Sequence, residues 1–215
     1  MKAVIFDMDG VIFDSERLFI QYSQEIALKM GYKMDWEFGL SFVGVGQNII
    51  AEKLLKKYGD DFDLLTFEKN VFERYKKGVV DQELVMKNGV FELLEYLKKE
   101  DYKIGLASST QGELVVWQLE KYGLLKYFDH IIGGDDVCHN KPCPECYLSS
   151  LRFLEATPNE TYVIEDSFDG VKAGFDADAN VIMVPDLIEP NIQITKMCKF
   201  VAKDLLNVID YLKNN

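Results

Sequence analysis

The chain has 215 residues, 48% of them hydrophobic and 28% charged, a balance typical of a globular protein and too apolar for a disordered one. Its 36 acidic residues outnumber 24 basic ones, and the net charge of −12 argues against a general nucleic-acid or anionic-membrane binder. A small anionic substrate is still compatible with this net charge, because local cations or a metal ion can outweigh the overall negative field of the protein. With four cysteines, no visible signal segment and no membrane-spanning stretch, we expect a cytoplasmic protein with reduced thiols. We also expect a monomer.

Short, continuous apolar runs predict strands at 3–6, 104–107, 131–132, 162–164 and 181–184. Continuous rather than alternating apolarity indicates strands that are buried on both faces, as in a parallel sheet. Between them, helical periodicity is complete at 90–97 and 205–212 and less complete at 115–122. This alternation predicts an α/β fold with a doubly wound, Rossmann-like parallel sheet.

One region interrupts the alternation. Residues 15–82 show only helical periodicity, for example at Ala51, Leu54, Leu55 and Tyr58. We therefore predict a core domain of residues 1–14 and 83–215 with an inserted helical cap domain at 15–82. An insertion after the first strand is placed near the carboxyl ends of the strands, where open α/β sheets bind ligands, so we expect it to act as a lid.

Acidic residues directly follow two of the predicted strands. Asp7 and Asp9 come after the strand at 3–6, and Glu165 and Asp166 come after the strand at 162–164. Carboxylates at the end of a buried strand are costly unless they are neutralised. Because parallel strands end at one edge, the four carboxylates should converge, and a set of oxygen ligands suits Mg²⁺.

Polar groups follow two further strands. Ser108, Ser109 and Thr110 come after the strand at 104–107, and their hydroxyl and N–H groups could hold phosphate oxygens. Lys141 follows the strand at 131–132 and could pair with a carboxylate and a phosphate at once. Each feature alone has an ordinary explanation as a surface turn, a helix cap or a loop. Their joint order favours one shared site.

With these residues the sequence resembles the haloacid-dehalogenase-like (HAD) superfamily of phosphotransferases. Within it, the chain is most similar to the branch with a helical cap after the first motif, which includes phosphoglycolate phosphatases, sugar-phosphate phosphatases and β-phosphoglucomutases. The matching motifs are DMDGVIFDS at 7–15, Ser108 in GLASS, Lys141-Pro142 with Pro144, and IEDSFDGV at 164–171.

The resemblance implies a role for each motif residue. Asp7 is the nucleophile that becomes an aspartyl phosphate, and Asp9 is the acid and then the base. Ser108 and Lys141 hold the phosphoryl oxygens. Mg²⁺ is bound by Asp7, the main-chain carbonyl of Asp9 and Asp166, with Glu165 in or near that shell. A carboxylate can act as a covalent nucleophile, and cations around the phosphoryl group offset the charge on its oxygens during transfer.

The implied reaction is hydrolysis of a small phosphate monoester, such as a sugar phosphate or a similar metabolite. We expect substrate contacts from Gly10 and Ser109 and, in the cap, from Gly44 and Gln47. Related mutases have a His and an Arg where this chain aligns Phe19 and Gln47, which favours a phosphatase over the alternative, a sugar-phosphate mutase. Asp9 argues against a dehalogenase, and a non-catalytic binding protein with this fold is the remaining alternative.

Two other features have competing interpretations. The residues around Lys141 have a spacing compatible with a zinc site: Cys138, His139, Cys143 and Cys146. We favour the interpretation that these cysteines have no metal role and lie in a loop and in the helix that follows it. The basic residues Arg74, Lys76 and Lys77 are interpreted as a solvated helix face, with substrate binding as the alternative.

Overall fold

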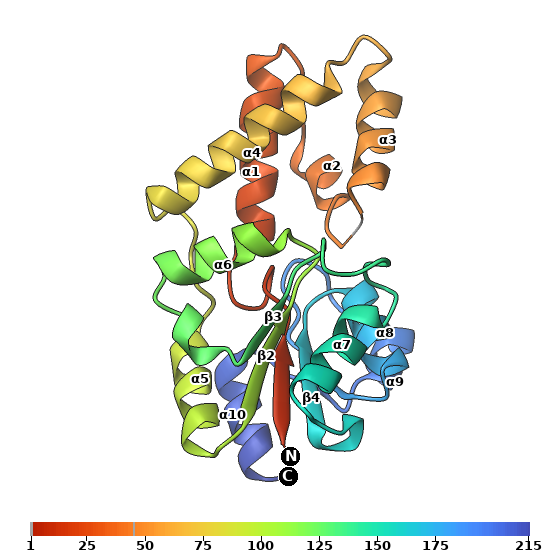
Figure 1. The fold of residues 1–215 in the computed structure, drawn as a ribbon. Coiled ribbons are helices and arrows are strands. Elements are labelled where there is room, and N and C mark those ends of the chain that lie inside the picture. The colour runs from red at the N-terminus through yellow and green to blue at the C-terminus, as the bar shows by residue number, and fades with distance from the viewer. Residues whose placement is uncertain (1, 45) are drawn as a thin grey trace. The chain divides into compact units, whose positions relative to one another are not determined.

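The protein is described by a computed structural model that covers residues 2–44 and 46–215. Across these residues, six strands form one parallel sheet in the order β3-β2-β1-β4-β5-β6 (Figure 1). The strands are β1 (Ala3–Phe6), β2 (Lys103–Ala107), β3 (His130–Ile132), β4 (Thr161–Glu165), β5 (Asn180–Met183) and β6 (Phe200–Val201). The predicted doubly wound parallel α/β fold is confirmed.

The central strand β1 determines where the functional residues emerge. All four of its side chains are buried, which agrees with its continuous apolar sequence. Phe6 lies beside Leu106 of β2 and Ile164 of β4 in the ladder register. The residues that follow these three positions therefore leave the sheet together, at what we call its carboxyl edge.

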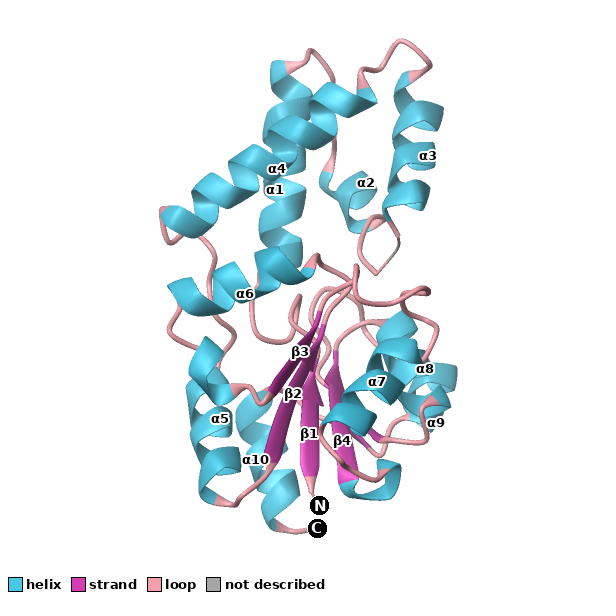
Figure 2. Cartoon of the chain, viewed as in Figure 1, coloured by secondary structure: helices cyan, strands magenta, loops and turns pink. Residues whose placement is uncertain are grey.

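Helices cover both faces of the sheet, as Figures 1 and 2 show. On one face lie α5 (Val90–Lys99) and α10 (Leu205–Lys213), and on the other lie α7 (Glu145–Phe153), α8 (Phe168–Asp176) and α9 (Ile192–Met197). The remaining elements of this part are α6 (Gly112–Lys121) and the short 3₁₀ helices η1 (Leu125–Tyr127) and η2 (Pro158–Glu160). The amphipathic patterns behave as expected, since Leu93, Leu94 and Leu97 of α5 are fully buried.

The sheet differs from the sequence prediction at its β5–β6 side. Strand β5 begins and ends one residue earlier than predicted. Val184 lies just beyond it, and its N–H donates to the carbonyl of Glu165 at 2.7 Å. Strand β6 was not predicted, because two half-buried residues are too short to show any periodicity. Its pairing with β5 is a tertiary feature.

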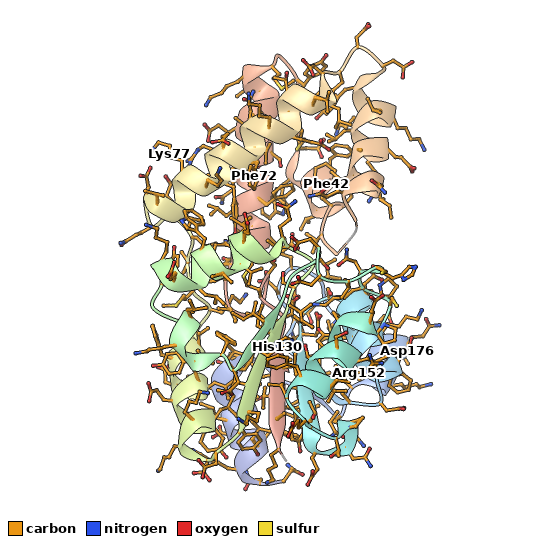
Figure 3. The ribbon with its side chains drawn as sticks, in the orientation of Figure 1. Phe42, Phe72, Lys77, His130, Arg152 and Asp176 are labelled. Atoms are coloured by element: carbon orange, nitrogen blue, oxygen red, sulfur yellow. The ribbon has the colours of Figure 1, made fainter. Side chains whose placement is uncertain are left out.

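In the part of the chain that the structure describes, two compact units can be distinguished, and Ser15–Val85 forms the second of them. Its helices are α1 (Ser15–Lys29), α2 (Trp36–Leu40), α3 (Gln47–Tyr58) and α4 (Leu64–Val80). The unit has an apolar core of its own, in which Phe42 is buried, whereas Lys77 projects from α4 (Figure 3). Among the described helices of the chain, none combines the length and apolarity needed to cross a membrane.

Candidate active site at the carboxyl edge of the sheet

Asp7 and Lys141 form the centre of the site. The N–H of Asp7 donates to the carbonyl of Ile164 at 2.9 Å, which continues the β1–β4 ladder by one residue. Lys141 Nζ lies 2.5 Å from Asp7 Oδ1 and donates to the carbonyl of Ala107 at 2.9 Å. It also lies 2.9 Å from Glu165 Oε1. One buried ammonium group therefore links the ends of β1, β2 and β4.

Glu165 is enclosed by protein donors. Its Oε1 accepts a hydrogen bond of 2.6 Å from the Tyr147 hydroxyl, and its Oε2 accepts from the N–H of Asp166 at 3.1 Å and from the hydroxyl of Ser167 at 3.1 Å. A Cβ at Gly170 would lie 1.8 Å from Glu165 Oε1, so only glycine fits there. Both oxygens of this carboxylate are thus already occupied, and one of them orients Lys141.

Asp166 completes a group of three acidic side chains. Carboxylate oxygens of Asp7, Glu165 and Asp166 all lie within 4.8 Å of one another. Gly10 makes this approach possible, because its φ is +81° and a Cβ at this position would lie 2.1 Å from Asp166 Oδ2. Sequence reasoning placed Gly10 among the substrate contacts, and the structure shows that it leaves room for Asp166.

Asp9 is held by the turn that follows β2. Its Oδ2 accepts hydrogen bonds from the hydroxyls of Ser108, at 3.2 Å, and Thr110, at 2.8 Å. The Ser108 hydroxyl also accepts from the N–H of Thr110 at 3.0 Å. The Asp9 carboxylate is therefore directed toward β2, while the neighbouring Ser109 side chain is exposed.

Burial and the charges of neighbouring groups shift the pKa values of Asp7 and Lys141. Burial raises the pKa of Asp7 to about 8; the carboxylates of Glu165 and Asp9 add to this shift and Lys141 opposes it. Burial alone would lower the pKa of Lys141, but Asp7 and Glu165 outweigh it, so the pKa of the ammonium is well above its ordinary value. When all three carboxylates are ionised, as they would be around a bound cation, these four groups carry a net charge of −2. An all-oxygen donor set with that charge fits a hard divalent cation such as Mg²⁺.

Not all of the predicted residues belong to this cluster. The structure brings Asp7, Asp9, Ser108, Lys141 and the Glu165–Asp166 pair to the carboxyl edge. The expected cap contacts lie in the helical unit, where Gly44 has a φ of +69° and Gln47 is the exposed first residue of α3. Their roles stay predictions.

Sequence reasoning missed two residues of the site's surroundings. Tyr147 was not singled out, although it is fully buried and bonded to Glu165, and Thr110 was named only as part of a hydroxyl run. The signal available for Tyr147 was weak: an aromatic residue with a polar tip, six positions after Lys141. Which way the start of α7 turns decides whether that hydroxyl reaches Glu165.

The basic residues of α4 are engaged within the helical unit. Arg74 Nε donates to Glu25 at 3.1 Å and Arg74 Nη2 donates to Glu83 at 2.8 Å. Its guanidinium also lies over the Tyr22 ring, 3.9 Å from the centroid. Lys76 and Lys77 pair with acidic residues three and four positions away in the chain. These contacts favour the interpretation of this run as a solvated, ion-paired helix face.

Comparison with known proteins defines the class to which this fold and site belong. Residues 4–184 match the family model described as haloacid dehalogenase-like hydrolase. The chain therefore belongs to this family and is an enzyme of the hydrolase class.

Similar proteins include a phosphatase, a pyrophosphatase and a structure described as a mutase. The chain is 37% identical over 174 residues to the phosphorylated carbohydrates phosphatase of Thermotoga maritima, with 80% of each chain covered. It is 28% identical to the pyrophosphatase PpaX of Listeria welshimeri, over 94% of this chain and 95% of the relative. A crystal structure from Thermotoga maritima, described as a candidate beta-phosphoglucomutase, superposes with a TM-score of 0.84 at 30% identity and covers 100% and 99% of the two chains.

Proposed function

We propose that the protein is a Mg²⁺-dependent phosphatase that hydrolyses a small phosphorylated carbohydrate or a similar metabolite through an aspartyl phosphate on Asp7. The observation that carries this proposal is the buried Asp7 carboxylate, in contact with Lys141 and grouped with Glu165 and Asp166. The names of the relatives, a phosphatase of phosphorylated carbohydrates and a pyrophosphatase, support the reaction class.

In the proposed first step, an Asp7 carboxylate oxygen attacks phosphorus, and the bond from phosphorus to the leaving oxygen breaks. Asp9 donates a proton to that oxygen, so the alcohol leaves neutral. In the second step, Asp9 accepts a proton from a water molecule that attacks the phosphoryl group. This step releases inorganic phosphate and restores the Asp7 carboxylate.

Lys141 is placed to stabilise Asp7 both as a free carboxylate and as an aspartyl phosphate. Its three N–H donors now serve Asp7, Glu165 and the carbonyl of Ala107. When a phosphoryl group binds, the Lys141 N–H that contacts Asp7 can donate to a phosphoryl oxygen instead. The other two N–H groups then keep the Lys141 side chain in place. The Ser108 hydroxyl, now bonded to Asp9, would supply another donor. Mg²⁺ would be held by Asp7, Asp166 and the Asp9 main-chain carbonyl, and would offset the negative charge of the phosphoryl oxygens.

The direct test is detection of the phosphorylated protein. After rapid acid quenching, the wild-type chain should carry a hydroxylamine-labile phosphate on the peptide that contains Asp7. The Asp7→Asn variant should lack this label and should release phosphate about 10³-fold more slowly or worse, because it has lost the nucleophile. A labelled residue other than Asp7, or a fully active Asp7→Asn protein, would contradict the proposal.

The substrate class needs a separate experiment. Phosphate release should be measured for sugar phosphates, glycerol 3-phosphate, phosphoglycolate and pyrophosphate, each with Mg²⁺ and after treatment with a chelator. We expect the highest kcat/KM for a phosphorylated carbohydrate and no turnover without the cation. Pyrophosphate as the preferred substrate would correct the substrate class and leave the role of Asp7 intact.

A mutase is the second candidate, because the chain resembles a structure described as a candidate beta-phosphoglucomutase. Against it, the position where related mutases have a His is occupied by Phe19, which packs on the apolar core of the helical unit. Gln47, at the position of the mutase Arg, lacks a positive charge. Conversion of β-glucose 1-phosphate to glucose 6-phosphate, faster than release of inorganic phosphate, would favour the mutase.

A further inference from the structure

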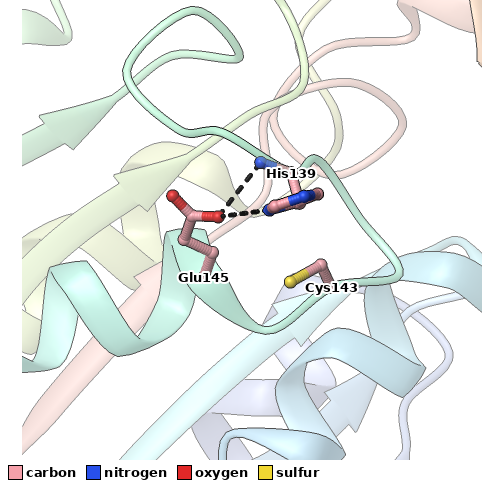
Figure 4. Close-up of side chains that lie close together, drawn as sticks. All are labelled: His139, Cys143 and Glu145. Atoms are coloured by element: carbon pink, nitrogen blue, oxygen red, sulfur yellow. Dashed lines mark hydrogen bonds and ion pairs between the residues drawn. The ribbon is translucent and has the colours of Figure 1, made fainter.

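The loop between β3 and α7 gathers a second set of ligand-type side chains. Glu145, the first residue of α7, accepts hydrogen bonds from the N–H groups of Cys138, at 2.8 Å, and His139, at 3.0 Å. The same carboxylate lies 3.3 Å from His139 Nδ1 (Figure 4). The N–H of Cys143 donates to the carbonyl of Asn140 at 3.1 Å and closes the turn between them. The loop is therefore folded back on Glu145.

This folding brings three different donor atoms together. A ring nitrogen of His139, Cys143 Sγ and a Glu145 carboxylate oxygen all lie within 4.8 Å of one another. In a tetrahedral zinc site, normal Zn–N, Zn–O and Zn–S lengths give ligand separations of about 3.4–3.6 Å. Small side-chain rotations span that difference. Figure 4 shows the Cys143 sulfur beside the gap between the other two side chains, and the His139 ring is 76% exposed, so ions in solution can reach it.

The chemistry of the set differs from that of the acidic cluster. Imidazole nitrogen and thiolate sulfur favour a borderline ion such as Zn²⁺ over Mg²⁺, which prefers oxygen alone. A thiolate, a carboxylate and a neutral imidazole carry a charge of −2, which a divalent ion balances. The N–H groups of Cys138 and His139 both donate to Glu145 and hold its carboxylate beside the His139 ring.

We propose that the His139 imidazole, Cys143 Sγ and the Glu145 carboxylate form a binding site for one Zn²⁺ or a similar transition-metal ion, with water as the fourth ligand. The cysteine spacing suggested a set made of Cys138, His139, Cys143 and Cys146, and the structure changes its membership. Cys146 is buried and is not one of the three grouped donors, which include Glu145 instead. Binding converts the Cys143 thiol to a thiolate and releases its proton to solvent.

The location of this site gives it a connection to the proposed active site. Lys141, whose ammonium contacts Asp7 and Glu165, lies in the chain between His139 and Cys143. A bound ion would therefore fix the backbone on both sides of Lys141. The test below measures metal binding itself, so its outcome does not depend on the phosphatase proposal.

The experiment is a Co²⁺ titration of the reduced protein with Mg²⁺ present in excess to fill the oxygen site. We expect tetrahedral d–d bands and a thiolate-to-cobalt charge-transfer band that saturates at one Co²⁺ per chain and is displaced by Zn²⁺. His139→Gln and Cys143→Ser should each weaken binding by at least about 10–100-fold, the loss typical even of an outer partner of a metal site. His139 is exposed, so its replacement leaves the core intact, and circular dichroism verifies that each variant is folded.

Cys138→Ser and Cys146→Ala are the matched controls, because each removes a thiol of the same loop region that lies outside the proposed set. Both should keep the charge-transfer band and its stoichiometry. The proposal is overturned if wild-type protein shows no thiolate band, if the band survives Cys143→Ser, or if either control abolishes it.

Discussion

Replacing Tyr147 by Phe removes one hydroxyl from the interior of the candidate active site. Tyr147 and Glu165 are both fully buried, and the hydroxyl donates to Glu165 Oε1 at 2.6 Å. Burial, reinforced by the charge of Glu165, raises the pKa of Tyr147 well above its ordinary value, so the hydroxyl stays a donor at every pH at which the protein is handled. Phe keeps the ring and its packing, so the variant isolates this hydrogen bond.

The magnitude follows from the charge and burial of the acceptor. A hydrogen bond to a charged group contributes about 1.5–3 kcal/mol, and in the variant Glu165 Oε1 would keep only Lys141 as its partner. We expect the free energy of unfolding to fall by about 1.5–3 kcal/mol. For a protein of this size that corresponds to a Tm lower by about 3–12 °C, measured by calorimetry or circular dichroism.

The same substitution should also affect turnover. Without the Tyr147 hydroxyl, Glu165 competes more strongly with Asp7 for Lys141, because Lys141 Nζ lies 2.9 Å from the oxygen that loses its donor. We expect kcat to fall about tenfold, equivalent to about 1.4 kcal/mol, with a smaller change in KM.

The matched control is Tyr127→Phe, which removes a hydroxyl that donates to Glu95, a carboxylate exposed at the surface. It should cost less than about 1 kcal/mol, as is usual for exposed polar contacts. The reasoning is refuted if Tyr147→Phe lowers stability no more than Tyr127→Phe does and leaves kcat unchanged.

Three further predictions concern other parts of the chain. Gly10→Ala should weaken Mg²⁺ binding and reduce kcat, because the added methyl group would collide with Asp166. Gly123 is also at positive φ but faces open space, so Gly123→Ala should affect stability alone. Equal effects of the two substitutions on Mg²⁺ binding, measured by calorimetry, would contradict this reasoning. Lys87→Met should lower the free energy of unfolding by about 3 kcal/mol, because it leaves the buried Asp186 carboxylate without its cation. Chemical denaturation measures this loss, and a value below about 1 kcal/mol would contradict the prediction. Arg74→Gln should destabilise the protein by about 0.2–1 kcal/mol at pH 7, because the hydrogen bond from Arg74, and then that from Tyr22, lowers the pKa of Glu83 from 4.5. That stabilisation is present above pH 4.5 and is lost as the pH falls through the lowered pKa. In thermal melts from pH 7 to pH 3 the two proteins should therefore converge, and a difference that grows on acidification would exclude the mechanism.

The residues at strand ends could be predicted because a parallel sheet has one carboxyl edge. Once 3–6 and 162–164 were identified as buried strands, Asp7 and the Glu165–Asp166 pair were expected at the same edge, and the structure places their oxygens within 4.8 Å because β1 and β4 are neighbours. Lys141 was placed near them by the same argument, although it follows the short strand β3 by a loop.

Residues on helix faces could not be located in the same way. Tyr147 reaches Glu165, and Glu145 joins His139 and Cys143, only because of the direction in which α7 leaves its loop. Gly10 was identified as part of the first motif, but its steric role depends on where Asp166 of another strand lies.

The sequence by itself determined five strands of a parallel sheet and the chemical identity of the acidic cluster, because burial on both faces and the position after a strand leave a pattern in the order of the residues. Only the tertiary structure decided how these groups are paired. Whether a carboxylate faces an ammonium, a hydroxyl or another carboxylate depends on contacts between residues far apart in the chain, such as Lys141 with Asp7 and Thr110 with Asp9. Local periodicity carries no information about such contacts, since their geometry comes from the packing of helices against the sheet.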